Sequence, residues 1–337
     1  MSRAIQYIVS NHNNKHGANM KRFAALIAIL LLGASAASAQ LNVHFINVGQ
    51  GDATYIELPN GHNALIDGGP SGQPVLNFLK ARGVHTIDHV ILTHPHSDHF
   101  MGLRTVFRNF QVKNFYDTRV ENTKAQGDNE VRAMAANMPG CKVHYPEAGT
   151  NLNWDSRVTV KVLNTCAETI TTNNSEEINN CSIVTRFYYN GHGVLLTGDI
   201  EAVVENAMTK IFKSGLDSTY LKVSHHGSKS SSAPKFLERV QPRVAIISVG
   251  RDNDYGHPHK EAMDRLMASG AQIYTTLDGD QSLTIPAPKR GVEIMMNGQL
   301  NLPVSVTPQP GFRMTDHTVD PADSAAMRQL MQEAAAE

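Results

Sequence analysis

The sequence has no large excess of either charge, few cysteines, and no apolar run long enough to cross a bilayer comfortably. Its 30 lysines and arginines nearly balance 31 aspartates and glutamates. This balance argues against a broad nucleic-acid-binding surface, although a local basic groove is compatible with it. With 41% hydrophobic and 18% charged residues, the chain has the composition of a globular protein with a sizeable core.

The main apolar run near the N-terminus, residues 23–32, is only about ten residues long, too short for a membrane helix. It follows a basic start at residues 20–22 and precedes Ala37-Ser38-Ala39, a small-residue cleavage pattern. Residues 1–39 are therefore predicted to be an N-terminal extension and signal peptide, with a membrane anchor as the alternative. Cleavage before Gln40 would leave an exported chain, periplasmic or secreted, with no stable membrane insertion.

The three cysteines are Cys141, Cys166 and Cys181. In an oxidising compartment, Cys166 and Cys181 are the best candidates for a disulfide, because they flank a polar stretch between two strand-like runs. Cys141 would be left over. Three reduced and unrelated thiols are the alternative interpretation.

Residues 93–99 are the most informative segment of the chain. They follow the apolar, β-rich residues 89–92, which predict a buried strand. Four candidate metal ligands stand within six residues: His94, His96, Asp98 and His99. In an extended turn the first two histidines point the same way, and the Asp-His pair points to a second position beside a following helix. One turn can therefore supply ligands to two metal ions.

Three later loops repeat this pattern of a strand followed by histidine or aspartate. The strand predicted over residues 194–197 leads to Asp199, which can bridge two cations or, alternatively, cap the helix that starts near Glu201. Residues 221–228 run from a strand into a His-His-Gly-Ser sequence, and residues 253–259 carry two more histidines. Because α/β proteins place their sites at strand ends, the four loops together predict one site.

The rest of the chain alternates strands and helices, which predicts two sheets packed face to face with helices outside. The predicted strands cover residues 43–48, 53–58, 158–163, 183–189, 194–197, 220–223, 244–249, 273–276, 282–285 and 292–295, and the predicted helices cover residues 75–82, 130–138, 201–212, 234–240 and 259–268. No internal repeat or linker is seen before about residue 302. We expect one domain over residues 40–301 and a C-terminal tail, residues 302–337, with a possible amphipathic helix.

The motif set resembles the metallo-β-lactamase superfamily and, within it, the hydrolase domain of ComEC-type competence proteins. The segments that resemble it are residues 47–53, 65–69, 93–99, 195–199, 225–228 and 255–258. The resemblance covers roughly residues 41–296. It implies a metallo-β-lactamase-like hydrolase domain folded as an αβ/βα sandwich of two mixed sheets, with a metal site at the sheet edge and Asp67 supporting that site.

The resemblance also implies a ligand set for one or two divalent ions per chain, Zn²⁺ or Mn²⁺. One ion would be held by His94 and His96. The other would be held by Asp98 and His99, with Asp199 bridging the two ions.

Further site residues follow from the same resemblance. His225 is the preferred additional ligand of the second ion, with His226 as the alternative. His257, Ser228 and Lys222 are candidates to contact a phosphate or to protonate a leaving group, and Lys222 is alternatively an ordinary strand residue.

Two features of the chain bear on the metal and on the reaction. Most dinuclear members of the superfamily supply a third histidine to the first ion, but the interval before Asp199 holds only His144 and His192. The expected place reads Asn-Asn-Cys-Ser at residues 179–182, so this site is expected to bind more weakly or to favour Mn²⁺ over Zn²⁺. True β-lactamases of this fold usually have cysteine where this chain has Asp199, and a bridging carboxylate suits hydrolysis of phosphodiesters or esters.

We therefore expect an exported metallohydrolase in which Asp98 serves the reaction as a ligand of the ion that activates water. The expected substrates are phosphodiesters, either nucleic acid or phosphorylated envelope components. A lactone or carboxyl-ester hydrolase of the same fold is the alternative, and a non-catalytic metal-binding protein is a third possibility. The sequence predicts no oligomeric state.

Overall fold

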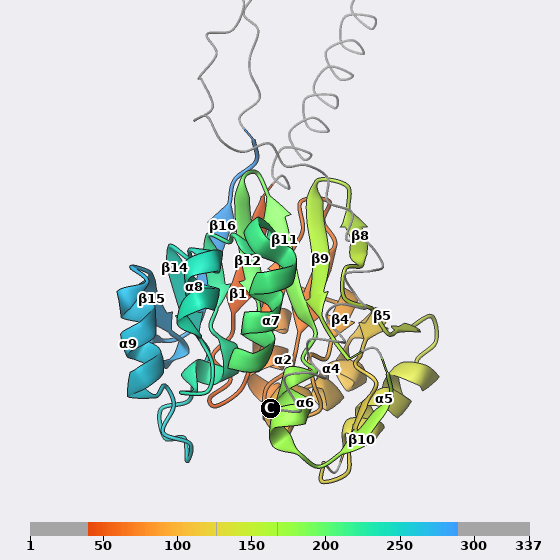
Figure 1. Cartoon of the computed structure of the whole chain (residues 1–337). Coiled ribbons are helices and arrows are strands. Elements are labelled where there is room, and N and C mark those ends of the chain that lie inside the picture. Colours follow the sequence, from red (N-terminus) through yellow and green to blue (C-terminus); the bar gives the residue numbers. More distant parts are fainter. Residues whose placement is uncertain (1–39, 126, 167, 289–337) are drawn as a thin grey trace, which may run out of the picture.

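The computed structural model describes residues 40–288 except residues 126 and 167. Two seven-stranded mixed sheets pack face to face, and helices cover the outer face of each sheet (Figure 1). The predicted αβ/βα sandwich is confirmed. The predicted signal peptide, the strand over residues 292–295 and the C-terminal tail lie outside the described residues.

The first sheet has the strand order β16-β1-β2-β3-β4-β5-β7. Its strands are β1 (Leu41–Phe45), β2 (Thr54–Glu57), β3 (Asn63–Ile66), β4 (Thr86–Ile91), β5 (Gln111–Tyr116), β7 (Lys142–His144) and β16 (Gln281–Ile285). The pairs from β16 to β3 are antiparallel, and those from β3 to β7 are parallel. The strand β16 therefore returns the end of the described chain to the sheet where it began.

The second sheet has the order β15-β14-β13-β12-β11-β9-β8. Its strands are β8 (Asn151–Asp155), β9 (Val158–Asn164), β11 (Val184–Tyr189), β12 (His192–Leu196), β13 (Tyr220–Lys222), β14 (Val244–Ile247) and β15 (Gln272–Thr275). The strands β11 and β12 pair in antiparallel register as a hairpin, and β12 to β15 are parallel. A small parallel pair, β6 (Val120–Asn122) and β10 (Ile170–Thr172), lies apart from both sheets.

Helices flank both sheets. Those beside the first sheet are α2 (Gly72–Ala81), α3 (Ser97–Phe100), α4 (Leu103–Asn109) and α5 (Asp128–Asn137). Those of the second half are α6 (Ser175–Asn180), α7 (Ala202–Phe212), α8 (Pro234–Val240) and α9 (Lys260–Ala268), with the short 3-10 turns η1 (Lys213–Leu216), η2 (Ser224–Gly227) and η3 (Thr276–Asp278). Proline at the first position of α8 fits a helix start, because its missing N–H would have no partner there.

The core has three layers because each sheet buries both of its faces. Phe45 of the first sheet and Phe187 of the second belong to one cluster between the sheets. A second cluster joins the outer face of the first sheet to α2, α4 and α5, and a third joins the second sheet to α7, α8 and α9. Burial on both faces explains why residues 194–196 of β12 read as a continuous apolar run rather than an alternating one.

The topology gathers the polar loops at one edge of the sandwich. The strands β3 and β4 are parallel neighbours, as are β12, β13 and β14. The carboxyl ends of parallel neighbours meet at the same edge of a sheet, where ligands of α/β proteins commonly bind. All four histidine- or aspartate-bearing loops predicted from the sequence begin there.

Candidate metal centre

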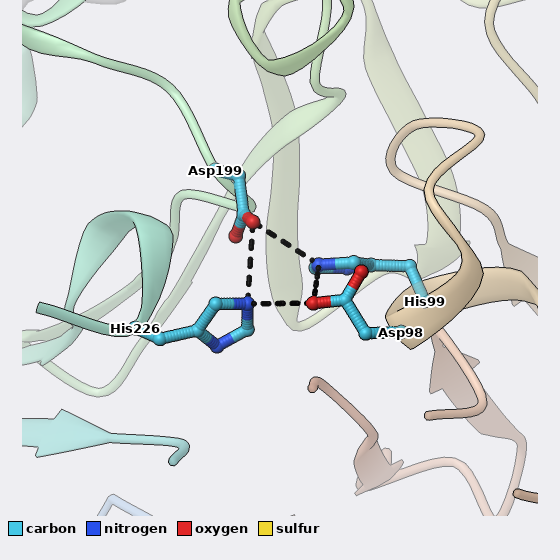
Figure 2. A group of neighbouring side chains, drawn as sticks. All are labelled: Asp98, His99, Asp199 and His226. Carbon is cyan, nitrogen blue, oxygen red and sulfur yellow. Dashed lines mark hydrogen bonds and ion pairs between the residues drawn. The ribbon is translucent and has the colours of Figure 1, made fainter. Parts of the chain in front are cut away.

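Four side chains from three of these loops converge on one point (Figure 2). One ligand atom from each of Asp98, His99, Asp199 and His226 lies within 4.8 Å of the others. The Nε2 atom of His226 lies 3.2 Å from Asp199 Oδ2 and 3.3 Å from Asp98 Oδ2. The Nε2 atom of His99 lies 3.2 Å from the same Asp199 oxygen. Two carboxylates and two imidazoles thus face one another at the end of the sandwich.

The other ring nitrogens of these histidines are tied to fixed acceptors. The Nδ1 of His99 donates to Asp67 Oδ2 over 2.8 Å, and the Nδ1 of His226 donates to the carbonyl oxygen of Ser248 over 2.9 Å. A ring whose Nδ1 carries the proton presents the lone pair of Nε2 when it is neutral. Metal-ligating histidines commonly use a carboxylate or a backbone carbonyl in this way. The predicted supporting role of Asp67 matches this contact.

His94 is oriented by the same logic, through two hydroxyl groups. Its Nδ1 lies 3.1 Å from Thr93 Oγ1 and 3.2 Å from Ser182 Oγ. The Thr93 hydroxyl donates its hydrogen to Asp67, and the Ser182 hydroxyl donates its hydrogen to the carbonyl of Asn179. Neither can donate to His94, so the Nδ1 of His94 must be the donor. Its Nε2 then faces the centre as an acceptor, 3.8 Å from Asp199 Oδ2.

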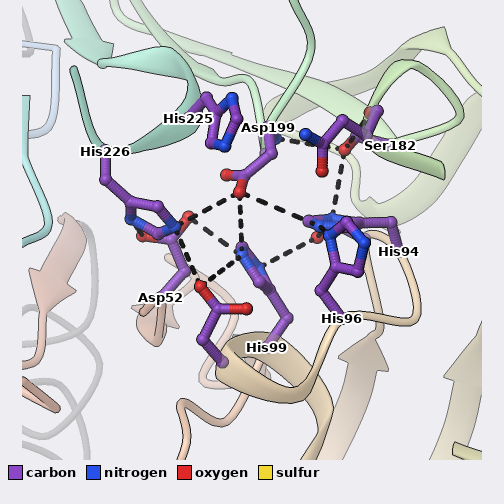
Figure 3. Close-up of polar contacts among 12 residues, drawn as sticks. Asp52, His94, His96, His99, Ser182, Asp199, His225 and His226 are labelled. Carbon is purple, nitrogen blue, oxygen red and sulfur yellow. Dashed lines mark hydrogen bonds and ion pairs between the residues drawn. The ribbon is translucent and has the colours of Figure 1, made fainter. Parts of the chain in front are cut away.

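His96 stands beside His94 (Figure 3) and is partly exposed, whereas His94 is buried. Its Nδ1 lies 3.0 Å from His94 Nε2, and its Nε2 lies 3.3 Å from Ser175 Oγ. Burial lowers the pKa of both rings, and that of His94 falls well below its usual range. Both imidazoles are therefore neutral near pH 7, as ligands must be.

A buried ion pair lies beneath the centre. Lys222, 2% exposed at the end of β13, forms an ion pair with Asp52, and its Nζ also lies 3.8 Å from Asp199 Oδ1. Burial lowers the pKa of the ammonium, but Asp52 and Asp199 outweigh this effect and raise the pKa above its usual value. Lys222 is therefore a fixed positive charge behind the ligands rather than a group in the pocket.

The glycine-rich loop that carries Asp52 approaches the histidine motif closely. A Cβ on Gly51 would stand 2.2 Å from the carbonyl oxygen of Asp98, and the backbone N–H of Asp52 donates to that same oxygen. Only glycine permits this approach. The loop thereby fixes the Asp52 carboxylate against the ligands.

The electrostatics of the group call for a bound cation. Although burial lowers the pKa of His226, the carboxylates of Asp199 and Asp52 raise it to about 10, and those of Asp199 and Asp67 raise the pKa of His99 well above its usual range. Burial raises the pKa of the Asp199 carboxyl, but the neighbouring His226 and His99 outweigh this effect and hold that pKa far below its usual range. Such shifts mark buried negative charge that needs protons or a metal ion to balance it.

The donor atoms fit a divalent metal ion. The Nε2 of His226 and the Oδ1 of Asp199 are buried and make no hydrogen bond to any residue that the structure describes. Imidazole nitrogens and carboxylate oxygens are ligands of Zn²⁺ and, with more oxygen, of Mn²⁺. A cation at this point would satisfy both atoms and separate the two facing carboxylates.

The loop after β13 holds His226 through an unusual backbone. His225 and His226 both adopt positive φ values, 49° and 52°, which non-glycine residues rarely do. The buried carboxylate of Glu205, on α7, braces the loop by accepting hydrogen bonds from Ser224 Oγ and from the backbone N–H groups of Ser232 and Ala233. The strained turn directs His226 into the centre and His225 to its rim, where its Nδ1 lies 3.4 Å from Glu201.

A pocket opens beside the four-residue group. Its walls include Asp98 and Asp199 and, at the rim, His225, Tyr255 and His257. Burial and the neighbouring histidines His225 and His226 lower the pKa of His257 to about 4, so this ring is neutral near pH 7. Ser228 does not line this pocket, and its hydroxyl pairs with Ser230.

The structure brings together most of the residues predicted from the sequence: His94, His96, Asp98, His99, Asp199 and His226. It places His226, rather than the preferred His225, against Asp98 and Asp199. The alternative role of Asp199 as a helix cap is wrong, because the cap of α7 is Glu201. His144 and His192 lie elsewhere, bonded to Asn114 and Thr219.

Two contributors were given no role from the sequence, Asp52 and Ser182. Asp52 follows two glycines in residues 49–52, a pattern that favours a tight loop. This pattern was the only local feature of the sequence that could have pointed to Asp52. Ser182 lies in the segment where a third histidine was expected. Its hydroxyl orients His94 through Nδ1 and also accepts from the backbone N–H of Asp199 over 3.1 Å.

A sandwich of two mixed sheets with a cluster of histidine and aspartate at its edge defines a metallohydrolase of the metallo-β-lactamase fold. The model of the metallo-beta-lactamase superfamily matches residues 46–251. The chain belongs to this superfamily.

Among curated proteins, the chain is similar to competence and recombination proteins. It is 28% identical to ComE operon protein 3 of Bacillus subtilis over 74% of this chain and 33% of that protein. It is 31% identical to Recombination protein 2 of Haemophilus influenzae over 66% of this chain and 26% of that protein. The chain spans about a third or less of the length of these relatives. In the part of the chain that the structure describes, no helix is long and apolar enough to cross a membrane.

Two solved structures are similar to this chain at low sequence identity. The metallo-β-lactamase fold protein YhfI from Bacillus subtilis is 12% identical, with a TM-score of 0.47 over 72% of this chain and 99% of that one. The metallo hydrolase Igni18 from Ignicoccus hospitalis is 14% identical, with a TM-score of 0.47 over 73% of this chain and 100% of that one. The family assignment rests on the sequence match and on the sheet topology.

Proposed function

We propose that this chain is a metal-dependent phosphodiester hydrolase, with nucleic acid as its substrate. The observation that supports it most is the common orientation of three imidazoles. The Nδ1 atoms of His94, His99 and His226 are bound to hydroxyl, carboxylate and carbonyl groups of the protein, and their Nε2 atoms all turn towards Asp199. Three buried rings with this orientation are a preformed set of metal ligands.

The ligands divide into a stronger and a weaker set. Asp98, His99, Asp199 and His226 would hold the principal ion, with four donors already within 4.8 Å of one another. His94 and His96, together with Asp199, would hold a second ion. No third histidine joins them, because Ser182 stands in the segment where it was expected and directs its hydroxyl to the Nδ1 of His94. We expect this second site to bind more weakly and to tolerate Mn²⁺.

Bound divalent ions supply a Lewis acid for the phosphate oxygens and activate water for attack on phosphorus. The side chains of this protein do the positioning. The Lys222 ammonium offsets the charge of Asp52, which leaves Asp199 free to act as a ligand. His257 lines the pocket as a neutral imidazole whose Nδ1 has no hydrogen-bond partner among the described residues, and it would contact a substrate phosphate.

A phosphodiester is favoured over a lactam or a lactone by the chemistry at residue 199. A carboxylate here adds a hard oxygen donor to a centre that already has Asp98, and oxygen-rich sites suit ions that coordinate phosphate oxygens. The similarity to a protein named for recombination, a process of nucleic acids, supports nucleic acid as the substrate. The near-neutral charge of the chain argues against a broad basic surface, so we propose that binding is local to the pocket.

The test compares three substrates on one purified protein, reloaded separately with Zn²⁺ and with Mn²⁺. Bis-p-nitrophenyl phosphate should be hydrolysed, and hydrolysis should disappear in the Asp98→Ala variant and after chelation. Nitrocefin should be left intact. If a lactone is cleaved well while every phosphodiester stays untouched with both metals, the phosphodiesterase assignment is wrong and an ester hydrolase replaces it.

We also propose that the chain is exported and that its mature N-terminus lies at or near Gln40. The cleavage pattern at residues 37–39 supports this, as does the Cys166–Cys181 disulfide, because disulfides persist in oxidising compartments. Intact-mass measurement of protein recovered from a periplasmic or secreted fraction tests it. A mass that retains residues 20–39 would reject cleavage.

A further inference from the structure

We propose that Tyr255 is a stacking platform for a planar base of the substrate, so that the pocket selects phosphodiesters of nucleosides over simple alkyl ones. This inference rests on the proposed phosphodiesterase function and names what the rim of the pocket recognises. Four observations lead to it: exposure, position, ring geometry and the hydrogen bonds of the loop.

The exposure of Tyr255 is unusual for a large ring. Its side chain is 65% exposed, the highest value among the exposed large hydrophobic residues of the described chain. This exposed ring does not lie on an ordinary part of the surface. It lines the pocket that holds Asp98 and Asp199. Exposed aromatic rings beside a reaction centre are typical of ligand contacts.

The ring is the outermost member of a row that leads to the metal ligands. Tyr255 stacks on His257 with the ring centroids 5.6 Å apart and the planes 19° apart. His257 in turn lies 6.1 Å from the ring of His226, at 30°. Because Tyr255 lines the same pocket as Asp98 and Asp199, a planar group stacked on this ring can belong to the same substrate as a phosphate at the centre.

Hydrogen bonds of the Asn253 side chain hold the loop that carries the ring. The Asn253 side chain donates to the carbonyl oxygens of Gly250 and His257, each over 2.8 Å, and accepts from the backbone N–H of His257 over 2.9 Å. These three bonds close the turn around Tyr255. A preformed ring loses little freedom when a ligand stacks on it, which favours affinity.

The rest of the pocket explains why the ligand is a base rather than an apolar group. Its other walls are mainly polar, with the side chains of Gln50, Ser97, Ser175 and His96 among them. A nucleobase suits such a place, because it offers a flat face to tyrosine and polar edges to its surroundings. Stacking on an aromatic side chain contributes roughly 1–3 kcal/mol per base and is tolerant of sequence.

The experiment uses two substrates with the same leaving group, thymidine 5′-(p-nitrophenyl phosphate) and methyl p-nitrophenyl phosphate. In the Tyr255→Ala variant, KM for the thymidine ester should rise roughly tenfold while kcat stays unchanged, because stacking lowers the energies of bound substrate and transition state equally. The methyl ester should be cleaved as by the unaltered protein. Tyr255→Phe should behave like the unaltered protein on both substrates.

The matched control is Tyr274→Ala, which removes another exposed tyrosine, 46% exposed on β15 and absent from the pocket walls. This variant should cleave both esters with the same KM and kcat as the unaltered protein. An equal loss on the two esters in Tyr255→Ala, or none on either, would overturn the proposal.

Binding measurements separate this proposal from the proposed function. Calorimetry with thymidine 5′-monophosphate and with methyl phosphate needs no turnover. Suppose that no phosphodiester is cleaved, but that thymidine monophosphate binds more tightly than methyl phosphate and Tyr255→Ala abolishes this difference. The phosphodiesterase assignment then fails and the stacking role of Tyr255 stands. If the two phosphates bind the unaltered protein equally, the platform is wrong whether or not the protein is a phosphodiesterase.

Discussion

The choice between two adjacent histidines shows how a single residue gains its role from the backbone. His226 and His225 have the same side chain, but only His226 donates Nδ1–H to a buried carbonyl and turns Nε2 to both Asp98 and Asp199. His225 faces Glu201 at the rim. The strained turn, rather than the residue type, decides which one meets the centre.

This difference gives a paired prediction. The His226→Ala variant should lose most of its bound metal and lower hydrolysis by at least about 10²-fold, because it removes one of four ligands. His225→Ala should keep its metal and lose much less activity. Elemental analysis of each variant, purified without chelator, checks both statements, and equal metal loss in the two would show that either ring can serve.

Lys222 provides a second prediction at this scale. The Lys222→Met variant leaves the Asp52 carboxylate buried without its cation, so we expect the free energy of unfolding to fall by about 3–5 kcal/mol. The double variant Asp52→Asn with Lys222→Met should recover a large part of this loss. Denaturant titration of the four proteins in the cycle measures it. Additive losses would mean that the two side chains do not stabilise each other.

At the residue scale, the sequence predicted ligands better than it predicted their supports. The spacing of residues 93–99 is local, so the histidines and Asp98 could be identified from one strand and one turn. Asp52 and Ser182 act through contacts with Asp98, Lys222 and His94 that are distant in sequence. No local pattern reports such contacts.

At the scale of elements, α7 and the loop after β13 depend on one buried carboxylate. Glu205 is 0% exposed, and burial raises its pKa to about 7 despite the hydrogen bonds that it accepts. A pKa raised on folding contributes stability that is complete below the unfolded value near 4.5 and is lost as the pH rises through 7. Glu205 should therefore stabilise the fold more in acid than at neutral pH.

The Glu205→Gln variant tests this at a site outside the ligand set. Its carboxamide cannot accept all three hydrogen bonds, so it should be less stable than the unaltered protein at pH 5. The difference in unfolding free energy between the two proteins should shrink between pH 5 and pH 8, by at most about 3 kcal/mol. Denaturant unfolding over this range measures the difference. A gap that does not shrink between pH 5 and pH 8 would show that Glu205 is ionised in the folded protein throughout this range.

The disulfide holds the element that approaches the centre from the side of His96. Cys181 ends α6, the helix that begins with Ser175, and its bond to Cys166 closes a loop with a sequence separation of 15 residues. This pair was predicted from its flanking strands and is confirmed. Cys141 remains free, as expected.

Replacing Cys166 and Cys181 together by serine should lower the free energy of unfolding by roughly 3 kcal/mol in the chain-entropy model, because the unfolded chain gains freedom. Cys141→Ser, which breaks no bond, is the control. Denaturant unfolding without reductant gives both values. A double variant as stable as the control would show that the bridge does not constrain the unfolded chain.

Element prediction succeeded where apolar patterns were long. The helix predicted over residues 234–240 coincides with α8, and α7 begins one residue later than expected. Short elements such as β6, β10 and α6 were missed, since three to six polar residues show no period. They form through distant partners, as when β10 pairs with β6 fifty residues earlier in the chain.

At the scale of the whole molecule, the fold explains why distant motifs form one site. The two sheets bring the ends of β3 and β4 opposite those of β12, β13 and β14, so residues 100 positions apart, such as His99 and Asp199, meet. The alternation of strands and helices indicated this sandwich from the sequence. It could not indicate which side of each loop faces inward, because that depends on the packing of one sheet against the other.

The measurement that tests the central claim most directly is the metal content of the protein, purified without chelator, alongside that of Asp199→Ala. The Nε2 atoms of His94, His99 and His226 all turn towards Asp199. We predict more than half an equivalent of divalent metal per chain in the unaltered protein and the loss of most of it in the variant. No bound metal in the unaltered protein, or full content in Asp199→Ala, would contradict the account.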